Sequence, residues 1–164
     1  VEDLLGAIKI VKEQIPEVQC KIIGSGPREN KLKALARELG IDDRVEFLGF
    51  IPKRSDVIAL MKRSHVFCLP SLVEGFGMVT IEALAAGIPY VNSDIPATRE
   101  ITEGGIGGLL FEPKNIGDLA EKMMLTLRAQ NISETQRLQA DRLIRAYEWK
   151  RLSAPLVDTY KRLV

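Results

Sequence analysis

The sequence has few aromatic residues and almost no net charge, and it contains no long apolar run. Aromatic residues make up 5% of its 164 residues, which disfavours the stacking platforms of proteins that bind single-stranded nucleic acid. The formal net charge of +1 gives no electrostatic preference for nucleic acid, so no nucleic-acid partner is expected. Because neither a signal peptide nor a membrane-spanning run is recognisable, we expect a soluble chain without direct membrane contact.

Potential metal ligands are equally scarce. Cys20 and Cys68 lie far apart in the sequence, each inside an apolar strand pattern where a free thiol behaves as a small hydrophobic group. Two such cysteines favour a reducing, cytoplasmic compartment over a disulfide scaffold. His65 is the only histidine, and we expect it to be a packing or surface residue. Without a cluster of ligands, the sequence predicts no metal site and no cofactor.

Strand and helix patterns alternate along the chain. Strand patterns cover residues 18–23, 45–48, 66–69, 89–92 and 109–111. Helical patterns cover residues 1–15, 32–39, 56–62, 80–86, 115–127, 134–146 and 149–164, and a polar turn is expected after residue 92. Repeated strand–helix units predict an α/β fold with a doubly wound, mostly parallel sheet. We expect a single domain over residues 1–164 that includes the C-terminal helices 115–164.

The most informative segment reads Glu-Gly-Phe-Gly-Met-Val-Thr-Ile-Glu, from Glu74 to Glu82. It joins a strand pattern closed by Pro70 to a helical pattern that stops at Gly87, a good helix terminator. A glycine-hinged turn into a helix presents unpaired N–H groups and the positive end of the helix dipole, which suits a phosphate. Two carboxylates would repel a phosphate, so hydroxyl groups are their expected targets. Phosphate together with vicinal hydroxyls describes a nucleotide attached to a sugar.

These acids also admit a purely structural interpretation. Glu82 would then be an ordinary acid in the first turn of a helix, and Glu74 a solvated loop charge. Spacing alone does not decide, since Glu38 and Glu46 are equally far apart without any surrounding motif. What distinguishes the first pair is the order of strand, proline, Gly-Phe-Gly turn and helix around it.

Two further glycine turns follow strand patterns, at Gly24-Ser25-Gly26 and at Gly49-Phe50. Ligands of doubly wound sheets bind at the carboxyl ends of the strands. Each turn taken singly is adequately explained as a tight connection. Together with the turn at residues 75–77, they outline a groove at one edge of the predicted sheet.

The run from Leu69 to Pro89 resembles the donor-binding signature of GT-B glycosyltransferases. More narrowly, it resembles the retaining enzymes of glycosyltransferase family 4 and their E-x7-E motif. The likeness continues in the family's order at residues 22–27, 45–50, 93–101 and 107–111. It implies the Rossmann-like, nucleotide-sugar-binding half of a GT-B fold. The implied reaction transfers a sugar from a UDP-, GDP- or ADP-sugar to an acceptor hydroxyl with retained anomeric configuration and without a metal.

The resemblance also implies a role for each site residue. Glu74 would lie beside the transferred sugar as the catalytic carboxylate, and Glu82 would accept hydrogen bonds from the two ribose hydroxyls. The remaining donor-binding residues are implied at the glycine turns and the helix start: Gly24, Gly26, Phe50, Phe76, Gly77, Met78, Val79 and Thr80.

The chain also departs from the family. Family members carry an arginine and a lysine just upstream of the first helix, where both contact the diphosphate. Residue 1 already lies in that helix, so we expect the first strand, both basic residues and the N-terminal acceptor domain to be missing here. Such a half would bind nucleotide weakly and would not transfer sugar alone. Arg28, Lys53 and Arg54 are either aids to phosphate binding or surface charges, and the full-length enzyme could dock peripherally on a membrane through its other half.

Two other functions remain open from the sequence. A nucleotide-sugar epimerase of GT-B fold shares the ligand but usually places a histidine in the cleft, for which His65 is poorly located. A flavodoxin-like binding or receiver module would place clustered acids after its first strand, where this chain has Gly24-Ser25-Gly26.

The last helical pattern carries an apolar stripe formed by Trp149, Leu152, Leu156, Tyr160 and Leu163. This stripe would either pack on the chain's own sheet or be covered by the missing domain. In the second case it would leave an exposed apolar surface on this chain.

Overall fold

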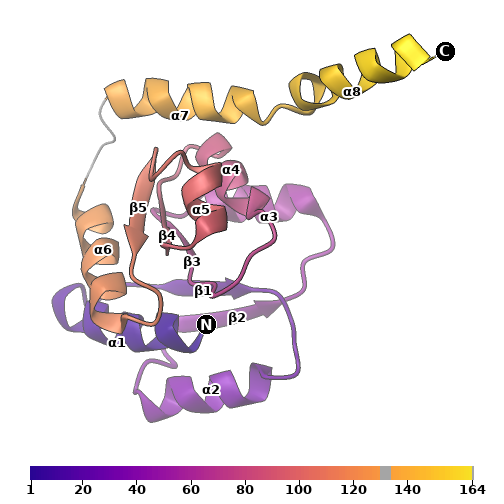
Figure 1. Cartoon of the computed structure of the whole chain (residues 1–164). Coiled ribbons are helices and arrows are strands. Elements are labelled where there is room, and N and C mark those ends of the chain that lie inside the picture. Colours follow the sequence, from indigo (N-terminus) through magenta and orange to yellow (C-terminus); the bar gives the residue numbers. More distant parts are fainter. Residues whose placement is uncertain (130–133, 164) are drawn as a thin grey trace.

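The computed structural model describes residues 1–129 and 134–163. Five short strands are β1 (Cys20–Ile23), β2 (Val45–Gly49), β3 (Phe67–Leu69), β4 (Tyr90–Ser93) and β5 (Gly108–Phe111). Helices precede and follow them: α1 (Glu2–Gln14), α2 (Glu29–Glu38), α3 (Arg54–Lys62), α4 (Met78–Ala85), α5 (Pro96–Ile101), α6 (Ile116–Arg128), α7 (Glu134–Ala146) and α8 (Trp149–Leu163). The alternation of helices and parallel strands confirms the predicted α/β class (Figure 1).

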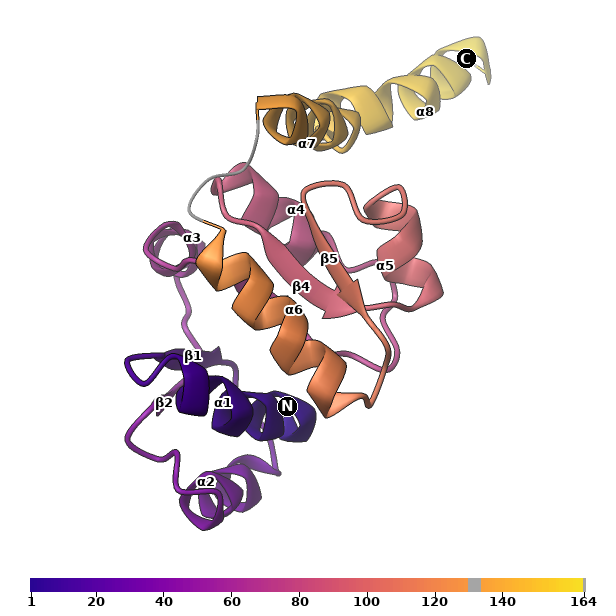
Figure 2. The same cartoon turned by 90° about the vertical axis from the view of Figure 1, so that its left-hand side faces the viewer.

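The strands form two parallel sheets where the sequence predicted one. β1 pairs with β2, and β4 lies between β3 and β5. The described strands β1 and β3 are not paired with each other, although both sheets contribute to one core. Figure 2 shows β1 and β2 apart from β4 and β5. Strands that are not direct neighbours in a doubly wound fold do not pair, and β1 and β3 are two such strands.

Helices cover both faces of the strands. The larger core joins α1, α2 and α6 to β1 and β2, and it includes Val91 and Phe111 of the second sheet. A second core lies on the opposite face of β4, where Tyr90 packs against Ile81 of α4 and Leu143 of α7. The alternation of Tyr90 and Val91 between two cores follows from the two-residue period of a strand. β4 is therefore the buried central strand of its sheet.

The short helix α5 lies where the sequence predicted only a polar turn. Pro96 occupies its first turn, a position where the missing N–H of proline costs nothing. The N–H of Ile95 donates to the hydroxyl of Thr98 at 3.2 Å, which holds the helix start in place. Only Thr98 and Ile101 are buried, so the helix has too few apolar residues for a recognisable pattern.

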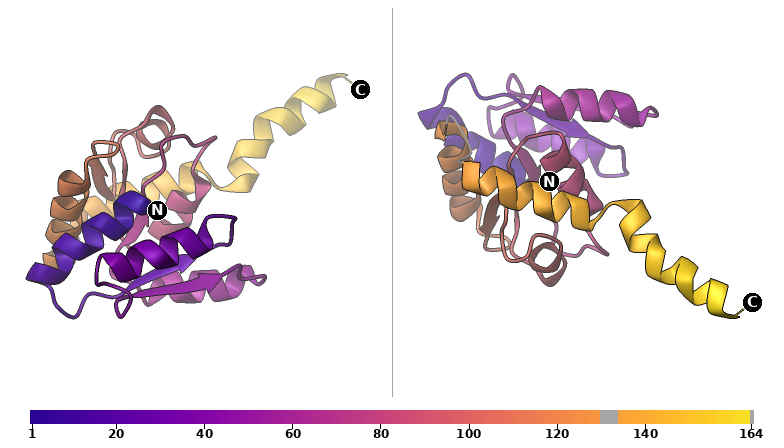
Figure 3. Two further views of the ribbon diagram at one scale, coloured as in Figure 1. Left: turned by 90° about the horizontal axis from the view of Figure 1, so that it is seen from below. Right: turned by 90° about the horizontal axis from the view of Figure 1, so that it is seen from above.

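The two C-terminal helices differ in how much of their surface is buried. α7 packs across α4 and buries Ala140 and Leu143, whereas α8 extends away from the body of the molecule (Figure 3). No residue among those described in α8 is buried. The apolar stripe of α8 does not pack on the chain's own sheet, so it lies exposed.

Candidate functional site: the start of helix α4

The segment from Glu74 to Glu82 follows β3 as an irregular loop and then enters α4. Gly77 is the N-cap residue, with φ of 78° and ψ of 32°, a left-handed conformation that glycine adopts without a steric penalty. No side chain caps α4, and the N–H of Thr80 donates to the carbonyl of Gly77 at 2.9 Å. The first N–H groups of a helix have no partner within it, which leaves those of Met78 and Val79 open. The helix thus begins with open amides, as the sequence predicts.

Both predicted acids accept hydrogen bonds from neighbouring side chains. The hydroxyl of Ser71 donates to Oε1 of the half-buried Glu74 at 2.5 Å, which ties this acid to its own loop. Nη2 of Arg54 donates to Oε1 of Glu82 at 2.6 Å. The Glu82 side chain is 24% exposed and that of Arg54 is 76% exposed, so the ion pair contributes little stability and can be exchanged for a ligand.

The other basic residues near the groove make different contacts. Arg28 donates to Glu2 of α1 at 2.6 Å and is largely exposed. Lys53 precedes α3 as its exposed N-cap residue. Of the three basic residues considered from the sequence, only Arg54 contacts a predicted site acid.

The two remaining glycine turns lie side by side. The N–H of Gly24 donates to the carbonyl of Gly49 at 2.8 Å, which joins the ends of β1 and β2. Gly24 has φ of 119°, and a Cβ added to it or to Gly26 would meet no atom within 4 Å. Phe50 follows and is 73% exposed. These residues form an open surface, which leaves room for a ligand at this end of β1 and β2.

An aromatic contact fixes the loop from the C-terminal side. The ring of Phe76 meets that of Tyr147 edge to face, with centroids 5.6 Å apart and planes at 73°. Burial, followed by the charges of Glu100 and Glu103, raises the pKa of Tyr147. Tyr147 was not predicted as a site residue, because it lies between two helical patterns and belongs to no motif.

The side chain of Thr80 points into the protein. It is fully buried, and its Oγ1 accepts a hydrogen bond from Nδ2 of Asn92 at 2.9 Å. A direct hydrogen bond from this hydroxyl to a ligand therefore requires that it become exposed. Asn92 was not predicted as a site residue, although a polar residue inside a buried strand pattern is a usable signal.

The two thiols lie in strands, as the sequence predicts. Cys20 and Cys68 are free and partly buried. Burial raises the pKa of Cys20 to about 11 and that of Cys68 to about 12, and the proximity of Cys20 adds to the second shift. Both residues pack against the same core. His65 is exposed, and within residues 1–129 and 134–163 no group of three His, Cys, Asp or Glu side chains could hold a metal ion.

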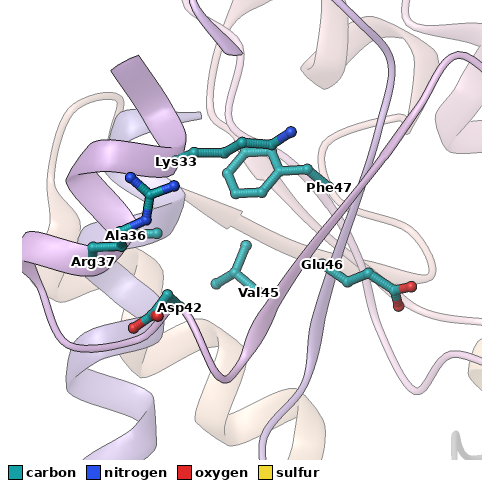
Figure 4. A pocket seen from close by; sticks show the side chains of 7 residues that line it. All are labelled: Lys33, Ala36, Arg37, Asp42, Val45, Glu46 and Phe47. Carbon is teal, nitrogen blue, oxygen red and sulfur yellow. The ribbon is translucent and has the colours of Figure 1, made fainter. Parts of the chain in front are cut away.

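Two surface cavities lie away from the loop. One, of about 300 Å³, opens between α2 and β2 and is lined by Lys33, Ala36, Arg37, Asp42, Val45, Glu46 and Phe47 (Figure 4). The other, of about 410 Å³, lies along α8. Neither contains a predicted site residue.

None of the helices in the described parts of the chain is long and apolar enough to span a bilayer.

Comparison with known proteins identifies the family. A family model described as "Glycosyl transferases group 1" matches residues 1–142. This chain belongs to that family. An uncharacterized glycosyltransferase of Haemophilus influenzae is 36% identical over 125 residues, which cover 76% of this chain and 35% of that protein. A phosphatidyl-myo-inositol mannosyltransferase of Mycobacterium leprae is 31% identical over 159 residues, or 96% of this chain and 41% of that protein. The chain thus spans well under half the length of these relatives.

Solved structures confirm the fold. HepE of Anabaena, in complex with UDP, superposes with a TM-score of 0.83 at 23% identity, covering 98% of this chain and 44% of HepE. Sucrose-phosphate synthase from Thermosynechococcus elongatus gives a TM-score of 0.82 at 24% identity, covering 97% of this chain and 42% of the synthase. At these identities the likeness concerns the fold alone, and it confirms the predicted Rossmann-like architecture.

Proposed function

We propose that this chain is the donor-binding half of a retaining glycosyltransferase, which moves a sugar from a nucleotide sugar to an acceptor hydroxyl. Membership of the group 1 family supports the reaction class. The UDP complex of HepE, which shares the fold, supports a nucleoside diphosphate as part of the ligand. The base, the sugar and the acceptor are left open.

One observation carries the proposal: α4 begins without a capping side chain, and a partly accessible acid lies on each side of its first turn, Glu74 in the preceding loop and Glu82 on the helix itself. The open amides of Met78 and Val79 would bind the diphosphate, helped by the positive end of the helix dipole. Because carboxylates repel phosphate, Glu74 and Glu82 are suited to hydroxyl groups on either side of it. Gly77 allows the backbone to approach the ligand closely.

The two acids have separate roles in this proposal, which takes the segment as an E-x7-E motif. Glu82 accepts hydrogen bonds from both ribose hydroxyls after releasing Arg54, which is then free to approach a phosphate oxygen. Glu74 contacts the hydroxyls of the transferred sugar, and Ser71 holds its carboxylate in position. Phe50 offers its exposed ring and backbone to the base.

Stabilisation of the leaving group is the main chemical demand of such a transfer. The bond from the anomeric carbon to the diphosphate oxygen breaks, and negative charge grows on the diphosphate. Fixed dipoles aimed at that charge lower the barrier, since they need no reorganisation during the reaction. In this proposal α4 and basic side chains supply the stabilisation, so the reaction requires neither a metal nor another cofactor.

The other half of the enzyme would supply the acceptor site. Because the curated relatives are more than twice as long as this chain, we place the acceptor domain in the remainder of the protein. A strand from that remainder would fit between β1 and β3, in the place of strand 1 of the doubly wound order. The exposed stripe of α8 would pack against the acceptor domain. The partly buried free thiols favour a reducing, cytoplasmic compartment.

Isothermal titration with UDP, GDP and ADP, run beside turnover assays, tests this function. We expect weak binding of one of these nucleotides and no sustained transfer by the isolated chain. Sustained transfer by this chain alone would show that no acceptor domain is needed. Absence of binding for all three nucleotides at millimolar concentrations would contradict the donor site itself.

A further inference from the structure

We propose that Asn92 is a positioning residue for the donor site, acting on the first turn of α4 through the hydroxyl of Thr80. This inference rests on the proposed function, because it assumes that the start of α4 binds the nucleotide diphosphate. Asn92 itself does not touch the ligand. Its effect passes through a buried contact between β4 and α4.

The contact is completely enclosed. Asn92 and Thr80 are both 0% exposed, and Nδ2 of Asn92 donates to Oγ1 of Thr80 at 2.9 Å. Asn92 lies on the central strand of its sheet, in register with Leu69 of β3 and Leu110 of β5. The strands on both sides therefore hold the backbone of Asn92 in place. Its side-chain amide can in turn hold Thr80, and with it the start of α4, in one position.

The contact reaches the loop glycine directly. Thr80 is the third residue of α4, and its N–H donates to the carbonyl of Gly77 at 2.9 Å. A Cβ added to Gly77 would lie 3.9 Å from Oγ1 of Thr80, so the hydroxyl lies just beneath the N-cap residue. A displacement of Thr80 would therefore move the amides of Met78 and Val79, which are the proposed diphosphate ligands.

The buried pair of Asn92 and Thr80 is less favourable for stability than an apolar pair would be. Oδ1 of Asn92 is buried without a hydrogen-bond partner among the described residues, and a buried unpaired acceptor costs folding free energy. Asparagine is also depleted in strands, where an apolar residue at this position would pack without that cost. A buried polar group that lowers stability calls for an explanation. The orientation of the first turn of α4 by Asn92 would explain it.

Four variants test the proposal. Asn92→Leu and Thr80→Val each remove one partner with little change in size, Thr80→Ser keeps the hydroxyl, and the double variant removes both polar groups. Ser93→Ala is the matched control, since Ser93 is the next buried residue of β4 and its Oγ likewise has no partner among the described residues. Two readouts are needed: the Kd of UDP, GDP and ADP, and hydrogen exchange of the hydrogen-bonded amides of residues 80–83 without nucleotide.

We expect Asn92→Leu and Thr80→Val to raise the Kd roughly three- to tenfold, the effect of about one hydrogen bond. Both should accelerate exchange in the first turn of α4 but not in α6. Thr80→Ser should bind as the unchanged chain does, and the double variant should bind no worse than either single one.

Several results would overturn the inference. One is an unchanged Kd in Asn92→Leu together with a lower midpoint of thermal unfolding, which would indicate a merely structural role. Another is that Ser93→Ala has the same effect as Asn92→Leu. If no nucleotide binds the unchanged chain, the proposed function fails. Exchange of the amides of residues 80–83 then still shows whether Asn92 holds the first turn of α4. Unchanged exchange in Asn92→Leu would refute the positioning role.

Discussion

Helices α4 and α8 differ in a way that their sequences do not suggest. α8 has 15 residues and a well-defined apolar stripe, yet none of its described residues is buried. α4 has only eight residues, of which Thr80, Ile81, Ala83 and Leu84 are buried. The difference comes from their neighbours: α4 packs between β4 and α7, whereas α8 contacts mainly α7. A helix whose first amides bind a ligand must be held in place by its neighbours, as α4 is and α8 is not.

The largest expected effect concerns the packing of α4. Leu84 is 6% exposed and belongs to the core that joins α4, β4 and α7. Because a cavity would remain in this core, Leu84→Ala should lower the free energy of unfolding by about 2–5 kcal/mol. Urea denaturation measures it. A loss below about 0.5 kcal/mol would mean that α4 is no better anchored than α8.

Alkaline pH tests the burial of residues in strands β1, β3 and β4. Burial raises the pKa of Cys20, Cys68 and Tyr90 to about 11, 12 and 12, from values of 9.0, 9.0 and 10.0. Between pH 9 and 12 the unfolded chain therefore binds fewer protons than the folded one, so stability falls as pH rises. The slope should approach about 1.4 kcal/mol per pH unit for each group that titrates only in the unfolded chain.

Urea denaturation at several pH values between 8 and 11 follows this loss. Stability that stays constant above pH 9 would contradict the burial of these three groups. Cys68→Val, which removes one titrating group at similar size, should flatten the dependence.

The next effect concerns ligand binding at α4. Glu82→Gln keeps the shape of the side chain but removes the charge proposed to bind the ribose hydroxyls. A hydrogen bond to a charged group is worth about 1.5–3 kcal/mol, so nucleotide affinity should fall about ten- to a hundredfold. Isothermal titration measures this, with Glu121→Gln on the exposed side of α6 as the control. Equal affinity in Glu82→Gln and the unchanged chain would favour a structural role for Glu82.

The smallest expected effect lies on α8. Leu156 is 59% exposed, so Leu156→Ala should change the free energy of unfolding of this chain by less than about 0.5 kcal/mol. The same urea experiment as for Leu84→Ala gives a direct comparison. A loss of 2 kcal/mol or more would show that the stripe of α8 is buried in solution, for example by self-association.

The sequence was sufficient for elements whose signal is local. Periodicity and helix terminators gave every strand and every helix except α5, and the glycine turn predicted the start of α4. α5 was missed because Pro96, Thr98 and their neighbours resemble a polar turn, whereas the backbone hydrogen bonds from Arg99 to Ile95 and from Thr102 to Thr98 show a helix.

Contacts between distant residues could not be predicted in this way. The separation of β1 from β3 depends on strand order, which has no signature in either strand. The contacts of Thr80 with Asn92 and of Phe76 with Tyr147 each join residues that no motif connects. The sequence thus predicted a candidate site, and the structure added the buried and aromatic contacts around it.

A nuclear magnetic resonance titration of the ¹⁵N-labelled chain with UDP, GDP and ADP tests the central claim most directly. The account predicts that one of these nucleotides shifts the amide signals of Met78 and Val79 most strongly, with further shifts near Gly24 and Phe50. Shifts confined to the cavity between α2 and β2, or no shifts at millimolar nucleotide, would contradict the assignment of the donor site to the start of α4.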